Sequence, residues 1–329
     1  MGVARPVSGD GDDGVGGRLT GGVRPASGRR CGGRPGGVVE ERLTMFHLFM
    51  PASAGYFAEE GVAARYDAYI DVSIPFYRAT LGSIAGHVVQ RLGKTAPGAL
   101  VELGCGTANL SREVMRRMSN FTEALLLDHS PSMLQVARKK LGDRGPGGLP
   151  IRYQLGSLQG QAWANLLEAR SCTAILAMLT LDHIAVDGEF TGLLTNVERR
   201  LRGDGLFVLA EKVATQDGPS RAVFEAMVEV RHRHLIDHRL MTTAQAARWR
   251  RHLLEEDHLR SLPHLIRLIE ASGMRVLFAE GVALPKTPSQ MTAEMFYQTS
   301  EPAVLSADQL SDDSLACAIA VLGCAGRRI

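Results

Sequence analysis

Disulfide frameworks, membrane spans and strong net charge are all missing from this 329-residue sequence. The five cysteines are odd in number and include no Cys-x-x-Cys pair, which predicts a reduced, cytoplasmic protein without disulfides. No apolar run reaches the ~20 residues that a membrane helix needs, and the N-terminus has no signal-peptide core. Net charge is only +2 at pH 7, so the chain offers no strong field to nucleic acid. A small molecule is the favoured partner.

The N-terminal residues 1–44 have few large apolar side chains and are rich in Gly, Arg, Ser and Pro. Such a segment cannot bury enough surface to offset its ordering entropy, so we predict a disordered tail. Two alternatives stay open, a basic arm that contacts a phosphate backbone and a translation start at Met45. Residues 45–97 are predicted to form a helical lid, in which Tyr66 and Tyr77 either pack on the sheet or line a pocket.

The strongest local signal is the sequence VELGCGTANL at residues 101–110. An apolar run precedes it, Glu102, Gly104 and Gly106 stand at every second position within it, and a helical pattern follows it. Glycine has no Cβ, so this strand–turn–helix permits a ligand to approach the backbone closely. A second apolar run ends at Asp128, at about the 20-residue spacing where an acid meets ribose hydroxyls. Asn109 stands where a dinucleotide fingerprint has its third glycine, which argues against a pyrophosphate cradle.

Polar residues follow later strands of the predicted sheet. The carboxyl ends of parallel strands face the ligand crevice, and Asp182, His183, Glu211 and Lys212 stand at such ends. His183, with an ordinary pKa of about 6.5, is the candidate general base, or else a helix-start residue that bonds the backbone. Glu211 is the second catalytic candidate, and Lys212 would position an acceptor unless the two pair with each other. The predicted strands include 151–155 and 206–210, and the run 172–178 is continuously apolar, as is typical of a buried parallel strand.

Residues 217–261 break the α/β alternation and predict a helical insertion rich in Arg and His. His234 and His238 are an i, i+4 pair with the spacing of metal ligands on one helix face. Arginines crowd the same segment and would repel a cation, so we predict no metal. An anion site and a solvated basic face are the remaining interpretations.

The rest of the chain divides into two parts. Residues 262–301 are predicted to complete the core, with a closing antiparallel pair at 274–279 and 294–299. In the C-terminal tail, 302–329, the run 315–323 is too short to span a membrane. It fits a helix packed on the body or a homodimer contact, and the sequence does not choose between them.

From Tyr66 to Thr299 the chain resembles the class I S-adenosylmethionine (SAM)-dependent methyltransferases, in which an acid-x-Gly-x-Gly turn precedes a strand-end Asp. The resemblance implies an α/β fold, a Rossmann-like, seven-stranded, mostly parallel sheet with an antiparallel last strand and core residues 98–216. It implies SAM as cofactor. The positions that match the family's SAM-binding residues are Tyr66, Tyr77, Glu102, Gly104, Cys105, Gly106, Asp128, His129, Ser130, Met133, Ser157 and Leu158. Of these, Ser157 replaces an acid that often bonds the adenine amino group.

Within this family the closest pattern is that of the carboxy-SAM synthases and related small-molecule methyltransferases. The segments SIPFY (73–77), DHSPSM (128–133) and LAEK (209–212) look like that group's Ser-Val-Pro-x-Tyr, Asp-Asn-Ser-Pro-x-Met and Leu-Ser-Glu-Lys. The glycine turn departs from the group, which has Gly-Cys-Ser-Leu. The group's carboxylate-binding arginine aligns without gaps to Ala246, and Arg248 is the candidate substitute.

Three activities remain in view. The leading one is methyl transfer to a small, carboxylate-bearing, amino-acid-like metabolite, held by Lys212 and Arg248. The second is carboxy-SAM synthesis, in which SAM itself accepts a carboxyl group. The third is an RNA-binding methyltransferase or a SAM-binding module without turnover, which the near-zero net charge disfavours.

Overall fold

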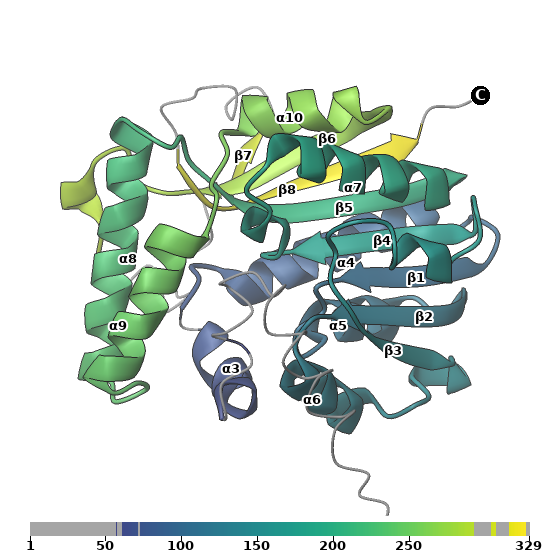
Figure 1. The fold of residues 1–329 in the computed structure, drawn as a ribbon, viewed down its shortest axis with the longest axis horizontal. Helices are drawn as coiled ribbons and strands as arrows, with labels where there is room; N and C mark the ends of the chain where they lie inside the picture. Colours follow the sequence, from purple (N-terminus) through teal and green to yellow (C-terminus); the bar gives the residue numbers. More distant parts are fainter. Residues whose placement is uncertain (1–56, 58–60, 72, 293–303, 307–315, 327–329) are drawn as a thin grey trace, which may run out of the picture. The chain divides into compact units, whose positions relative to one another are not determined.

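A parallel sheet forms the centre of the fold, and its strands arise from almost uninterrupted apolar runs. Figure 1 shows the computed structural model, which describes residues 57, 61–71, 73–292, 304–306 and 316–326. Every residue of β1 (Gly98–Leu103) and β4 (Cys172–Met178) is buried, as expected for strands covered on both faces. The other parallel strands are β2 (Phe121–Asp128), β3 (Ile151–Leu155) and β5 (Leu201–Val213).

The strand order determines where a ligand would bind. The chain runs outward from β1 to β2 and β3, and then returns across the sheet to β4 on the other side of β1. In open α/β sheets, ligands bind beyond the carboxyl ends of the strands at such a reversal of strand order. The ends of β1, β2 and β4 therefore mark the expected site.

Antiparallel strands complete the other edge of the sheet. β8 (Cys317–Gly326) pairs antiparallel with β5 and with β6 (Met274–Ala283), and the short β7 (Val304–Ser306) pairs with β6 at the edge. The predicted α/β class, a Rossmann-like and mostly parallel sheet with an antiparallel last strand, is confirmed. β7 adds an eighth strand to the seven that were expected.

The C-terminal run 315–323 corrects the sequence analysis. Both interpretations, a helix on the body and a homodimer contact, are wrong for the residues of β8, and the assignment of 302–329 to a tail misses this strand. β8 is almost wholly buried between two strands. An apolar run buried on both faces shows neither a helical nor a strand period, so periodicity does not distinguish the two. The predicted partner 294–299 and the tail 1–44 lie outside the described residues.

Helices cover both faces of the sheet (Figure 1). Leu100 of β1 belongs to the core under one set of helices, and the next residue, Val101, belongs to the core under the other set. This alternation is the normal strand period. The first set is α4 (Tyr77–Leu92), α5 (Asn109–Arg117) and α6 (Pro131–Leu141), and the second is α7 (Asp187–Arg200) and α10 (Leu262–Ala271).

A third core joins the two segments predicted as lid and insertion. α8 (Pro219–Asp237) and α9 (Thr243–Arg251) form the insertion, and α3 (Val62–Ile70) belongs to the lid. In this core the rings of Tyr69 and Trp249 lie 5.5 Å apart. In Figure 1 the three helices lie beyond the ends of β1 and β4, where the site is expected. Within the described chain, no helix combines the length and apolarity needed to cross a membrane.

Candidate active site

A cavity lies at the carboxyl ends of β1, β2 and β4. The catalytic candidate His183 lines it. Nine of the predicted cofactor residues also line it: Tyr66, Tyr77, Glu102, Gly104, Cys105, Gly106, Asp128, His129 and Met133. The sequence analysis did not select the remaining lining residues: Phe57, Thr107, Asn109, Leu110, Met178, Leu179 and Thr180.

The two glycines of the turn are needed for different reasons. Both have positive φ, +66° at Gly104 and +50° at Gly106, a conformation that costs other residues energy. A Cβ on Gly104 would lie 1.8 Å from Oγ1 of Thr180, whereas a Cβ on Gly106 would meet no described atom within 4 Å. Gly104 therefore permits close packing of two loops, and Gly106 leaves its backbone open to the cavity.

Asp128 ends β2 with its carboxylate held in place by backbone donors. Oδ2 accepts the N–H of Gly106 at 2.7 Å, and Oδ1 accepts the N–H of Ser130 at 2.8 Å. An ionised carboxylate has about four acceptor positions, so two hydroxyl donors can still be bound. The residue is buried and lines the cavity, which is the geometry expected of a ribose-binding acid.

Glu102 is the next-to-last residue of β1, beside the same turn. Its Oε2 accepts the N–H of Ser111 at 3.0 Å, which ties the first turn of α5 to the sheet. Burial raises the pKa of Glu102 to about 7, against an ordinary value near 4.5. Glu102 thus binds the backbone of α5 and also lines the cavity.

Asn109, at the position of the missing third glycine, connects the lid to the core. Its Nδ2 donates to Oδ1 of Asp67 at 3.0 Å and to the hydroxyl of Tyr77 at 3.3 Å, while its Oδ1 accepts from Nζ of Lys140 at 2.8 Å. Lys140 also pairs with Asp67 at 2.6 Å. The side chain that breaks the dinucleotide pattern therefore fixes the helices that carry Tyr66 and Tyr77 over the cavity.

Three predicted cofactor residues are absent from the described lining of the cavity. Ser130 caps α6, accepting the N–H of Met133 at 3.3 Å. Ser157 is exposed, and Leu158 packs against the hydrophobic core. Their contact with a cofactor stays a prediction.

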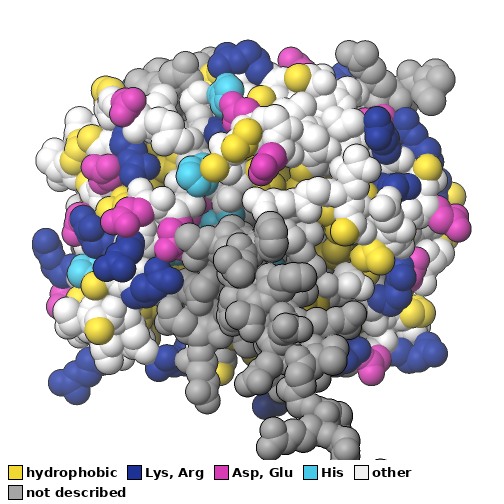
Figure 2. Space-filling view, viewed as in Figure 1, with side chains coloured by type: hydrophobic (Ala, Val, Ile, Leu, Met, Phe, Trp, Pro, Cys, Tyr) yellow, Lys and Arg dark blue, Asp and Glu magenta, His cyan; other side chains and the backbone are white. Residues whose placement is uncertain are grey.

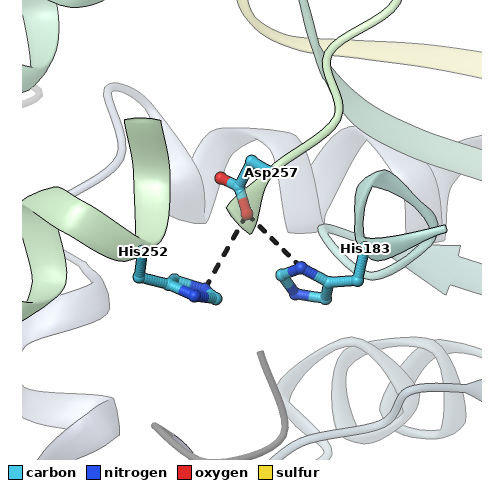
Figure 3. Close-up of side chains that lie close together, drawn as sticks. All are labelled: His183, His252 and Asp257. Atoms are coloured by element: carbon cyan, nitrogen blue, oxygen red, sulfur yellow. Dashed lines mark ion pairs between the residues drawn. The ribbon is translucent and has the colours of Figure 1, made fainter. Parts of the chain in front are cut away.

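His183 lines the cavity from the short helix η3 (Leu181–His183) after β4. Its Nδ1 lies 3.4 Å from Oδ1 of Asp257, and Nε2 of His252 lies 3.8 Å from the same oxygen. Figure 3 shows the three side chains converging from η3 and from the π-helix η4 (His252–Glu256) with the residue that follows it. Burial lowers the pKa of His252, and its Nδ1 lies 2.7 Å from Oε2 of Glu256.

Lys212 lies behind this group. Its Nζ is 2.6 Å from Oδ2 of Asp182 and 2.5 Å from Oδ2 of Asp257, and all three residues are buried. Burial alone would lower the pKa of Lys212, but the two carboxylates raise it above its ordinary value. Burial alone would likewise raise the pKa of Asp182, yet Lys212 and neighbouring histidines lower it to about 2. Lys212 does not belong to the described cavity lining.

Glu211 points elsewhere, since successive strand residues face opposite sides. Its Oε1 accepts the backbone N–H groups of Thr180 and Leu181, at 3.1 and 2.7 Å. Burial raises its pKa well above the ordinary range. The interpretation that Glu211 and Lys212 pair with each other is wrong, because Lys212 pairs with Asp182 and Asp257. Glu211 holds the loop of Thr180, and it is not among the described residues that line the cavity.

The arginines of the insertion have acidic neighbours. Nη1 of Arg248 is 2.9 Å from Oε1 of Glu256, and Arg250 pairs with Glu229. Figure 2 shows Lys and Arg side chains beside Asp and Glu side chains over α8 and α9. Arg248 is not in the described cavity lining, and Ala246 is buried in the third core. A role for Arg248 in binding substrate therefore stays a prediction.

Sequence reasoning missed the grouping of His183, His252 and Asp257. Residues 183 and 252 belong to segments far apart in the chain, and their spacing matches no metal or catalytic motif. The pair that the sequence did single out, His234 and His238, lies on α8 and its C-cap, with tilted rings whose centroids are 4.2 Å apart. Only the tertiary structure brings the first three together.

Comparison with known proteins agrees with this geometry. The family model of a methyltransferase domain matches residues 100–205. The carboxy-S-adenosyl-L-methionine synthase of Sulfurimonas denitrificans is 30% identical over 159 residues, covering 47% of this chain and 61% of the relative. The corresponding synthase of Campylobacter jejuni is 27% identical over 161 residues, covering 48% and 62%. The match thus spans less than two thirds of these curated relatives.

A solved structure supports the same fold. The complex between the Haloferax volcanii Trm112 methyltransferase activator and a methyltransferase contains a chain that matches with a TM-score of 0.50. The match covers 85% of this chain and 99% of that chain at 14% identity. At this identity the likeness concerns the fold alone. Residues 100–205 thus match a methyltransferase domain, in a chain with a Rossmann-like α/β fold.

Proposed function

We propose that this protein transfers the methyl group of SAM to a small-molecule acceptor that binds beside His183. One observation carries the proposal: the turn of Gly104 and Gly106, the carboxylate of Asp128 and the ring of His183 all line one cavity. A cofactor held by Gly104, Gly106 and Asp128 would share the cavity with a nucleophile that lies next to His183. Methyl transfer is an in-line displacement that depends mainly on such positioning.

The aromatic lining of the cavity suits a sulfonium cofactor. Phe57, Tyr66 and Tyr77 surround the space, and aromatic faces stabilise cations once water is excluded. Asn109 fixes Tyr77 through its hydroxyl, so the lid helices contribute a defined surface. These side chains would hold the cofactor and keep water from competing with the acceptor.

The acceptor must lose a proton if its nucleophile is a hydroxyl, thiol or ammonium group. His183 is the lining residue that can act on this proton, because its Nδ1 faces the buried carboxylate of Asp257. It can take the proton itself, or it can hold a cation that makes the acceptor more acidic. In both cases removal of His183 should lower kcat and leave SAM affinity nearly unchanged.

The sequence predicts an acceptor that is small and carries a carboxylate. The carboxylate has less support than the small size. The described lining of the cavity contains no lysine or arginine, and Arg248 and Lys212 each bind acidic side chains. Carboxy-SAM synthesis is the second candidate, favoured by the names of the matching relatives. The departures at the Gly104-Cys-Gly turn and at Ala246 count against it.

The two candidates give different products. The purified protein is incubated with SAM labelled in its methyl carbon and with a metabolite extract, and products are followed by mass spectrometry. Methyl transfer predicts a labelled metabolite together with S-adenosylhomocysteine, and the Asp128→Ala variant should form neither. If the SAM-derived species itself gains a carboxyl group, the synthase alternative replaces the proposal. A lack of any SAM-dependent product would overturn both.

A further inference from the structure

We propose that His183, His252 and Asp257 form a binding site for a divalent first-row transition metal ion at the acceptor end of the cavity. Nδ1 of His183, Nε2 of His252 and Oδ1 of Asp257 all lie within 4.8 Å of one another. Figure 3 shows both rings turned toward the same carboxylate oxygen. The binding of the ion is independent of the proposed function, whereas its role in methyl transfer rests on that function.

The distances from the two rings to the carboxylate oxygen suit a shared ion. Protein ligands lie ~2.0–2.2 Å from such an ion, so neighbouring ligand atoms are separated by roughly 3–3.5 Å. The distance from His183 Nδ1 to Asp257 Oδ1 is 3.4 Å, and that from His252 Nε2 is 3.8 Å. Closing the second distance requires a shift of a few tenths of an ångström in one buried ring.

Hydrogen bonding orients His252 as a ligand. Its Nδ1 lies 2.7 Å from Oε2 of Glu256, so a proton must lie between these two atoms. Arg248 in turn holds Oε1 of Glu256 at 2.9 Å. The neutral ring then directs the lone pair of Nε2 at a carboxylate oxygen. A ring whose far N–H is held by a carboxylate is the usual arrangement of a metal-binding histidine.

One carboxylate oxygen of Asp257 independently indicates that a cation can bind here. Its side chain is 0% exposed, and Lys212 occupies Oδ2, while Oδ1 has no hydrogen-bond donor among the described residues. A buried carboxylate oxygen without a partner is costly. An ion bound by Oδ1 and the two rings would remove that cost.

The charges around the group also favour a cation. Asp182, Asp257 and Glu256 contribute three carboxylates, against the two cations Lys212 and Arg248. With both histidines neutral, this buried group has an excess of negative charge. A divalent ion would change the net charge of the group from −1 to +1, and its attraction to the carboxylates would offset the cost of burying them.

The donor set indicates the class of ion and its use. Two imidazoles and one carboxylate suit Zn²⁺, Fe²⁺, Co²⁺ or Mn²⁺ rather than Mg²⁺ or Ca²⁺, which prefer oxygen ligands. Three protein ligands leave coordination positions open. Because His183 also lines the SAM cavity, an acceptor oxygen or nitrogen bound there would become more acidic and better placed for methyl transfer.

Binding of Co²⁺ to the purified, chelator-treated protein tests the site, by titration calorimetry and by the visible d–d absorption of the bound ion. We expect one equivalent in the wild type and at least about 100-fold weaker binding in His252→Ala. Glu256→Gln keeps all three ligands and should weaken binding by about 10- to 100-fold. His264→Ala is the matched control, since His264 pairs with Asp187 at 2.7 Å outside the group, and should bind Co²⁺ normally.

Two results would overturn the inference: no stoichiometric Co²⁺ binding by the wild type, or equal binding by all four proteins. Circular dichroism shows whether His252→Ala folds, and if it does not, Glu256→Gln decides by the same absorption bands. SAM affinity measured in chelator separates this inference from the proposed function. If methyl transfer persists at full rate in chelator, the ion's role in methyl transfer is wrong, while the methyltransferase and the Co²⁺-binding site are judged by their own tests. If Co²⁺ binds but no methylated product forms, the metal site stands and the proposed methyl transfer is wrong.

Discussion

The two ends of the cavity are built in opposite ways. At the end where the cofactor is proposed to bind, the continuous stretch from Glu102 to Met133 supplies most of the lining. Its acids Glu102 and Asp128 are bound by backbone N–H groups. At the end where the acceptor is proposed to bind, two segments far apart in the chain supply the group, one with His183 and one with His252 and Asp257. The acids there are held by Lys212 and Arg248. Backbone donors come with the turn itself, whereas side-chain cations must be brought in by folding.

The consequence appears in two acids that are buried to the same degree. Glu102 and Asp182 are each 3% exposed. Burial raises the pKa of Glu102 to about 7. For Asp182 burial also acts upward, but Lys212 and the nearby histidines outweigh it and lower the pKa to about 2. Burial thus does not decide the charge of a carboxyl group; the neighbouring cation does.

The largest effect is expected when that cation is removed. Lys212→Met leaves Asp182 and Asp257 buried and facing each other without a counter-charge. Breaking one side of a buried ion pair costs about 3–5 kcal/mol, so urea unfolding should show a loss of that size. Lys139→Met, on the exposed face of α6, is the control with no comparable loss. A change below about 1 kcal/mol would mean that Lys212 is not the residue that stabilises this end.

At the cofactor end, the next effect is a pH dependence of stability. The folded protein binds the proton of Glu102 more tightly than the unfolded chain, so this group makes stability fall as pH rises from about 4.5 to about 7. Glu102→Gln removes that fall, and the variant should gain roughly 3 kcal/mol on the wild type across the window.

Unfolding curves at several pH values measure this gain. Glu113→Gln is the contrasting variant, because hydrogen bonding by Arg116 lowers the pKa of Glu113. Its effect should have the opposite sign and appear as pH falls below about 4.5. Parallel wild-type and Glu102→Gln curves from pH 4.5 to 7 would contradict the raised pKa.

The next effect in size is expected when Asp128, the acid proposed to bind ribose, is removed. Asp128→Ala removes an acceptor of charged hydrogen bonds worth about 1.5–3 kcal/mol each, so SAM should bind at least tenfold more weakly by calorimetry. Asp143→Ala, an exposed acid paired with Arg138, should bind SAM as the wild type does. A melting curve checks that Asp128→Ala is folded, and unchanged affinity in a folded variant would remove Asp128 from the site.

The smallest effect is expected at Arg248. Its pair with Glu256 is partly exposed, and such pairs contribute about 1 kcal/mol or less. Arg248→Ala should therefore change stability little and leave SAM affinity within about threefold. A rise of about thirtyfold or more in the acceptor KM would instead restore the carboxylate-binding role expected from the sequence. A loss of SAM affinity equal to that of Asp128→Ala would erase the distinction between the two ends.

The sequence alone determined the cofactor end. The glycine turn, the acid that ends β2 and the apolar runs of β3 and β4 were all predicted at or near their residues. These features are local, because backbone conformation, capping and strand burial depend on neighbours within a few residues. The same reasoning found His183, since the end of a parallel strand faces the crevice whichever residues lie opposite.

Tertiary structure decided the rest. β8 was taken for a helix or a dimer contact because an apolar run buried on both faces carries no period. Pairing of Lys212 with its neighbour Glu211 was one of two interpretations, although adjacent strand residues face opposite sides and its partners lie 30 and 45 residues away. Asp257 and His252 carry no motif at all. A buried charge must find its counter-charge in space, and the sequence does not record which distant segment the folded chain places beside it.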